Sequence, residues 1–307
     1  MFAKLNKNPF PGLVEDYGRW MEQERGLSAL TIQMETSAIR HFLLWYEQKR
    51  RPFSAIAIQD VDQYLAVHGS TVWRRVTAAK KASTLRLFLR YAARRQWCAA
   101  SLAPAILGPR VYSHEAIPMG PSWNEVHKLL DHLDTNRPND IRDRAMIMLF
   151  AVYGLRSSEV AQLRLNDIDW ENNRLSVRSS KQRRLQQYPL VPSVGNAIIR
   201  YLQTVRPKNT LQREVFLSLH SPYGPISHGG TYHTVARPMA EVGIQPPHRG
   251  PHSLRHACAT HLLSKYFSLK EIGDLLGHRR TKTTQVYAKV DLPHLHEVAA
   301  FDLGGVL

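Results

Sequence analysis

The sequence predicts a mainly α-helical protein of two domains, with a small antiparallel β hairpin or sheet in the second domain. Three observations support this fold class. Apolar residues recur at helical spacing in several stretches, a short region around residue 180 alternates instead, and the segment 101–121 contains four prolines and two glycines. A chain of 307 residues, 43% of them hydrophobic, can fill two packed cores.

Residues 1–100 are expected to form a helical DNA-binding domain. Ser28 is placed to cap a helix that carries Ile39 and Phe42 on its apolar side. Farther along, Val72, Val76 and other apolar residues recur at near-helical spacing and are expected to be buried. The window between residues 62 and 115 contains nine cations and no acidic residue, which favours phosphate contacts over a merely solvated face. The expected DNA-binding residues here are Arg74, Arg75, Lys80, Lys81, Arg86 and Arg90.

Residues 101–121 are expected to be a semi-extended linker, and residues 122–307 to be the second domain. Ser122 and Glu125 have the spacing of a capping box. A helix from about 140 to 153 should end at Gly154, and Ser157 is placed to cap the next helix. Arg156 would then lie at the junction between two helices.

Two strands and three short helices are predicted after that junction. A polar hairpin loop, residues 179–187, carries Lys181. Pro251 suits the start of a helix on which His252 and Arg255 lie three residues apart. The next helix should open with a Ser268 and Glu271 capping box and end at Gly277, just before His278. A further helix beginning near Thr281 should carry Tyr287.

Composition narrows the function. The net charge of +16 indicates a polyanionic partner, and nucleic acid is favoured over a membrane surface. Cys98 and Cys258 form neither a CxxC pair nor a disulfide framework, as suits a reducing compartment. His252 and His256 have a spacing that zinc sites use, but no third ligand accompanies them. With neither a GxxxxGK[ST] nor an HExxH motif, no cofactor and no metal are expected.

These residues occur in a recognisable order. The boxes GLRSSEV and PHSLRHACATHLL, followed by LLGH and a tyrosine nine residues later, resemble the tyrosine recombinase (phage integrase) family, of the Xer/integrase type. The resemblance implies a two-domain, C-shaped DNA clamp whose first domain is a SAM-like core-binding domain. It also implies the catalytic set Arg156, Lys181, His252, Arg255, His278 and Tyr287.

The resemblance assigns a role to each of these residues. Tyr287 would attack a DNA phosphodiester and form a 3′-phosphotyrosine, with the two arginines and His278 as donors to the phosphoryl oxygens. His252 would assist proton transfer at the phenol, and Lys181 would protonate the leaving oxygen. The family often has glycines around this lysine, where Ser180 and Gln182 stand here, so Arg183 or Arg184 could fill its place.

The expected partner is double-stranded DNA with an inverted-repeat core site, contacted near the tyrosine by Arg279, Arg280 and Lys282. A homotetramer on two duplexes with an exchanged C-terminal tail is expected, in the prokaryotic cytoplasm at the nucleoid and without membrane attachment. Accessory DNA-binding proteins, the target sequence and the choice among integration, excision, transposition, inversion and dimer resolution are left open. The alternatives are a type IB topoisomerase and a noncatalytic DNA-binding regulator.

Overall fold

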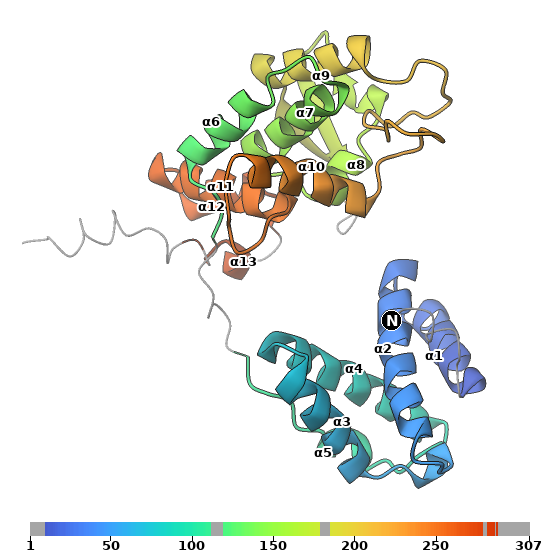
Figure 1. The fold of residues 1–307 in the computed structure, drawn as a ribbon. Coiled ribbons are helices and arrows are strands. Elements are labelled where there is room, and N and C mark those ends of the chain that lie inside the picture. Colours follow the sequence, from blue (N-terminus) through green and yellow to red (C-terminus); the bar gives the residue numbers. More distant parts are fainter. Residues whose placement is uncertain (1–9, 112–118, 179–184, 279–280, 286, 288–307) are drawn as a thin grey trace, which may run out of the picture. The chain divides into compact units, whose positions relative to one another are not determined.

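The computed structural model describes residues 10–111, 119–178, 185–278, 281–285 and 287 (Figure 1). The chain divides into two compact units, Met1–Glu115 and Ala116–Leu307, each with its own hydrophobic core. The fold is mainly helical and contains a three-stranded antiparallel sheet, which confirms the predicted fold class. Among the described residues, no helix has both the length and the apolar character needed to cross a bilayer.

The first unit is a bundle of helices around an aromatic core. Its elements are α1 (Pro11–Gln23), α2 (Ala29–Glu47), the 3-10 helix η2 (Phe53–Ala55), α3 (Ile58–Thr71), α4 (Arg75–Arg94) and α5 (Leu102–Ala105). Tyr17, Phe42 and Phe88 are fully buried between α1, α2 and α4. Ser28 caps α2 as predicted, because its hydroxyl accepts a hydrogen bond from the Thr31 backbone N–H.

Two expectations for this unit are wrong. The sequence predicts that Val72 and Val76 are buried, yet they are 71% and 63% exposed. Their spacing fits one continuous helix, whereas Val72 directly follows the end of α3 and Val76 lies in the first turn of α4. The segment 101–121 is not a semi-extended linker from its first residue, because α5 forms there and Ile106 is buried in the core of the first unit.

The second unit surrounds α7 (Pro138–Val152), which packs against α9 (Pro192–Thr204) and α11 (Pro251–Ser264) (Figure 1). The buried side chains of α7 occupy nearly its whole circumference, as expected of a central helix. The remaining helices are α6 (Trp123–His132), α8 (Ser157–Ala161), the 3-10 helix η3 (Leu165–Asp167), α10 (His228–Glu241), α12 (Leu269–Leu275) and α13 (Thr281–Gln285). The predicted capping boxes at Ser122 and Ser268 are both present.

The sheet has the order β1 (Ile168–Asp169), β2 (Arg174–Arg178), β3 (Leu185–Pro189), and all its pairs are antiparallel. The two predicted strands are β2 and β3, with Leu175 opposite Tyr188. The sheet also holds the end of α12. Tyr188 Oη donates to the Leu275 carbonyl at 2.8 Å, and Gln186 Nε2 donates to the Asp274 carbonyl at 2.7 Å. The residues that follow α12 are therefore fixed against the sheet.

Candidate active site

The predicted catalytic residues converge in the second unit, wherever the structure describes them. Arg156 precedes α8, His252 and Arg255 lie on α11, His278 follows α12, and Tyr287 follows α13.

Several predicted residues lie outside the part of the chain that the structure describes. They are Lys181 with its alternatives Arg183 and Arg184, then Arg279, Arg280 and the tail from residue 288. The side chain of Lys282 is likewise not described. Their roles therefore stay predictions.

Arg255 is the buried cation of the site, only 3% exposed. Its Nη1 donates to the Gly154 carbonyl, and its Nη2 donates to the Leu276 carbonyl at 2.6 Å. These bonds tie the end of α7 to the end of α12 and use two of the five guanidinium N–H donors. Arg156 Nη2 donates to the Gly277 carbonyl at 3.5 Å, next to the Leu276 carbonyl that Arg255 binds, so the two guanidinium groups are neighbours. Burial, followed by the charge of Arg156, lowers the pKa of Arg255.

Arg156 is held at the start of α8 by one carboxylate. Its backbone N–H donates to Glu159 Oε2 at 2.8 Å, and its Nη1 donates to Glu159 Oε1 at 2.7 Å. The sequence predicts Ser157 as the cap of this helix, and this prediction is wrong. Arg156 occupies the N-cap position, and Glu159 caps it from the first turn. The carboxylate thereby fixes both the backbone and the side chain of Arg156.

His278 is oriented by a threonine. It follows Gly277, whose φ of 63° ends α12, and its Nδ1 lies 2.8 Å from Thr284 Oγ1. Burial, then the charges of Arg255 and Arg156, lowers the pKa of His278 to about 4, so the ring is neutral near pH 7. If the threonine hydroxyl donates to Nδ1, the ring proton lies on Nε2, which can then donate to a phosphoryl oxygen.

Tyr287 is buried, 2% exposed, and its Oη lies 3.0 Å from His256 Nδ1. Burial raises the pKa of Tyr287 to about 12, although Arg255 opposes this shift, so the phenol is protonated. The partner of the phenol oxygen among the described residues is therefore His256, whereas the resemblance implies His252. His252 is exposed, and its ring packs against that of His256 with centroids 4.4 Å apart. The helix predicted to begin near Thr281 is α13, and Tyr287 itself has a 3-10 conformation.

Sequence reasoning misses three residues of the site: Glu159 as the partner of Arg156, Thr284 as the partner of His278, and His256. The spacing along the chain suggests His256 only as a zinc ligand beside His252. Within the described parts of the chain, no group of three or more histidine, cysteine or acidic residues is placed to hold a metal ion.

The expected DNA-binding residues of the first unit differ in solvent exposure. Arg74, Arg75, Lys80 and Arg90 are exposed. Lys81 is half-buried with Nζ 5.8 Å from the centre of the Trp73 ring, and burial lowers its pKa.

Arg86 serves the fold as well as carrying charge. It is half-buried, and its Nη2 donates to the Ile106 carbonyl at 2.8 Å. This bond ties α4 to the chain that follows α5. A phosphate contact by Arg86 would therefore have to share the guanidinium group with a structural hydrogen bond.

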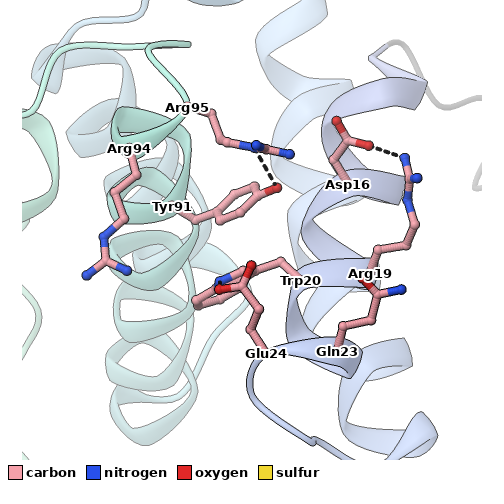
Figure 2. A pocket seen from close by; sticks show the side chains of 8 residues that line it. All are labelled: Asp16, Arg19, Trp20, Gln23, Glu24, Tyr91, Arg94 and Arg95. Carbon is pink, nitrogen blue, oxygen red and sulfur yellow. Dashed lines mark hydrogen bonds and ion pairs between the residues drawn. The ribbon is translucent and has the colours of Figure 1, made fainter.

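A hollow of about 270 Å³ lies between α1 and α4 of the first unit (Figure 2). Figure 2 shows that Arg95 points to the Tyr91 oxygen and that Arg19 pairs with Asp16. The hollow mixes both signs of charge, because Glu24 also lines it.

Two family profiles match the chain: "Phage integrase, N-terminal SAM-like domain" over residues 14–96 and "Phage integrase family" over residues 122–294. A Sinorhizobium fredii protein provisionally named integrase/recombinase y4rA is 37% identical over 289 residues, covering 93% of this chain and 69% of that protein. Tyrosine recombinase XerC of Halalkalibacterium halodurans is 30% identical over 287 residues, 91% and 93% of the two chains. The XerH site-specific recombinase, in a post-cleavage complex with palindromic difH substrate, shares the fold with a TM-score of 0.74, at 18% identity, over 94% of this chain and 84% of that one.

Proposed function

The chain belongs to the phage integrase family and is a tyrosine-type site-specific DNA recombinase, and from this premise we propose which of its residues carry out strand cleavage and rejoining. Tyr287 is the nucleophile. The observation that supports this assignment is that Arg255 lies near the buried phenol and also near Arg156 and His278, since these three side chains are the donors that an attacked phosphate requires.

In the proposed step, a bond forms between Tyr287 Oη and the phosphorus, and the bond from phosphorus to the 5′ oxygen breaks. The two guanidinium groups and His278 stabilise the charge that spreads over the nonbridging oxygens of the transition state. Lys181 gives a proton to the departing 5′ oxygen, and His252 assists the transfer of the phenol proton away from Tyr287. The products are a 3′-phosphotyrosine and a free 5′ hydroxyl. A 5′ hydroxyl from a second strand reverses the step without ATP, because the intermediate conserves the phosphoester bond.

A nicked suicide substrate tests this assignment once the attachment site has been mapped by sequencing DNA bound to the protein. Wild-type protein should become covalently attached to the 3′ side of the cut, visible on a denaturing gel. Tyr287→Phe should bind the same DNA and form no adduct. A noncatalytic regulator would give no adduct with either protein. A topoisomerase would form the adduct and relax plasmids, yet would not exchange strands between two cognate duplexes.

The assembly is part of the same proposal. The chain acts as a homotetramer on two duplexes, each with an inverted-repeat core site, as the palindromic substrate of XerH suggests by analogy. The tail beyond residue 288 docks on a neighbouring subunit. A chain truncated after Val290 should then cleave DNA as a weaker assembly, and a truncated chain that still forms a stable tetramer on DNA would contradict the tail exchange.

The first unit supplies further contacts to the DNA backbone, through the exposed cations of α4 and the residue before it. Arg279, Arg280 and Lys282 bind the backbone near the cut. The C-shaped clamp stays a prediction of the resemblance. We place the protein in the prokaryotic cytoplasm at the nucleoid, where duplex DNA is its substrate and accessory DNA-binding proteins can act with it.

A further inference from the structure

We infer that His256 positions the nucleophile: its Nδ1 accepts the hydrogen bond of the Tyr287 hydroxyl and so holds the phenol oxygen for attack. The role rests on the proposed function of Tyr287. The geometry is direct, since His256 Nδ1 and Tyr287 Oη are 3.0 Å apart and the two ring centroids are 5.6 Å apart. This distance is that of an ordinary hydrogen bond between a hydroxyl and an imidazole nitrogen.

The protonation states of the two partners allow the hydroxyl to be the donor of this hydrogen bond. Burial raises the pKa of Tyr287 to about 12, so the hydroxyl keeps its hydrogen at pH 7. Burial, then the neighbouring His252 and Arg255, lowers the pKa of His256 to about 4, so the imidazole is neutral and one nitrogen is an acceptor. We assign the imidazole proton to Nε2, so that the hydroxyl donates to Nδ1 and the lone pairs of the phenol oxygen remain available to face a phosphorus atom.

His256 is itself held from two sides. The ring of His252 packs edge-on against it, with an angle of 67° between the ring planes. The backbone of Gly120 lies against α11 so closely that a Cβ there would meet the Ser253 carbonyl and would lie 3.2 Å from His256 Cβ. A side chain fixed in this way can fix a hydroxyl, and misplacing a reacting atom by about 1 Å can cost about 100-fold in rate.

Three substitutions test the inference on the full-length protein. His256→Leu removes the acceptor, and adduct formation on a suicide substrate should slow by about 10- to 100-fold. His256→Asn places an amide oxygen close to the position of Nδ1 and should recover most of that loss, although asparagine does not titrate in this range. His261→Leu is the matched control, because His261 lies on the same helix but stacks on Trp123, and its cleavage rate should equal that of wild type.

A change of leaving group distinguishes a residue that acts on the nucleophile from a residue that protonates the 5′ leaving oxygen. A substrate with sulfur in place of the 5′ bridging oxygen loses a thiolate, which needs no proton. Sulfur should therefore restore cleavage by Lys181→Ala and leave His256→Leu slow. Restoration of His256→Leu by sulfur, or an equal loss in the Asn and Leu variants, would overturn the inference.

Folding and the proposed function are checked in the same experiment. Thermal unfolding and DNA affinity should be alike in wild type and His256→Asn, so that a difference in cleavage reports on the site. A wild-type protein without any covalent adduct would refute the role of Tyr287 itself. A wild-type adduct, together with unimpaired cleavage by His256→Leu, would refute only the role of His256.

Discussion

At His278, contact with a single hydroxyl occupies Nδ1 and leaves Nε2 as the ring nitrogen for the proposed contact with DNA. Thr284 Oγ1 lies 2.8 Å from Nδ1, and the threonine is 1% exposed, so this partner is shielded from competition with water. Gly273 leaves room for the hydroxyl, since a Cβ there would lie 2.9 Å from Thr284 Oγ1. The small residue on α12 and the threonine on α13 together set the orientation of the histidine.

Thr284→Val should therefore impair catalysis more than folding. With the proton of His278 assigned to Nε2, the Thr284 hydroxyl is the donor to Nδ1. Valine has nearly the shape of threonine but cannot make this donation, so His278 loses its tautomer preference and its Nε2 is less often a donor. We expect adduct formation to slow by about tenfold or more, in line with the loss of one transition-state donor, while DNA affinity stays the same. The exposed neighbour offers the control, and Thr283→Val should cleave like wild type. Equal rates for both variants would contradict the role of Thr284.

At the scale of single residues, the sequence predicts the residues that belong to motifs with regular spacing. It misses residues whose partners are distant along the chain. The sequence predicts Arg156, His252 and Tyr287 as site residues because their order and local boxes are visible along the chain. Glu159 could have been found, because it lies three residues from Arg156 and satisfies the spacing of a cap. His256 is 31 residues from its partner, and only the fold brings the two together.

At the scale of elements, two glycine turns bring the site residues together. Gly154 ends α7 with φ of 60° and Gly277 ends α12 with φ of 63°, a conformation that costs other residues about 1 kcal/mol or more. The carbonyls beside these turns accept the hydrogen bonds of Arg255. The helix ends thus form a frame around the buried guanidinium group.

Gly154→Ala should disturb this frame in two ways. The new Cβ takes on an unfavourable φ, and it collides with Leu276 Cδ2, just past the end of α12. We expect a loss of about 2–4 kcal/mol in the free energy of unfolding and a slower cleavage step. Gly243→Ala is matched in backbone conformation, with φ of 76°, but meets no atom within 4 Å. It should cost only the backbone strain, about 1 kcal/mol, and cleave normally. Urea unfolding of both variants measures the difference, and equal losses would argue against the collision.

The helices and strands that could be predicted are those marked by a motif of a few neighbouring residues. Ser28, Ser122 and Ser268 mark helix starts, and each caps its helix. The strand β1 spans only two residues, too few for an alternating pattern. The helix α5 contains a proline and lies in a stretch of linker-like composition, so only its packing on the first unit distinguishes it.

At the scale of the whole molecule, the sequence gives the net positive charge and the structure shows which of the described cations are exposed. The net charge of +16 favours DNA without selecting a sequence, and the exposed cations of α4 carry part of it. Burial refines the set that composition predicted, because Arg86 and Lys81 are half-buried while Lys80 and Arg90 are open. Pattern alone could not separate them, since all four lie in the same acid-free window.

Salt dependence should reveal which of these cations bind phosphates. Each phosphate contact adds about 0.9 to the slope of log affinity against log salt concentration, so Lys80→Ala and Arg90→Ala should each lower the slope by about that amount and weaken all duplexes equally. Lys49→Ala is the control from the same unit, because Lys49 already pairs with Asp60 at 3.5 Å and should leave the slope unchanged. Binding titrations over a range of salt concentrations, on cognate and unrelated duplexes, give the slopes. A slope that does not change in Lys80→Ala or Arg90→Ala would remove that residue from the DNA interface, whereas a change confined to the cognate duplex would mean that the residue reads bases.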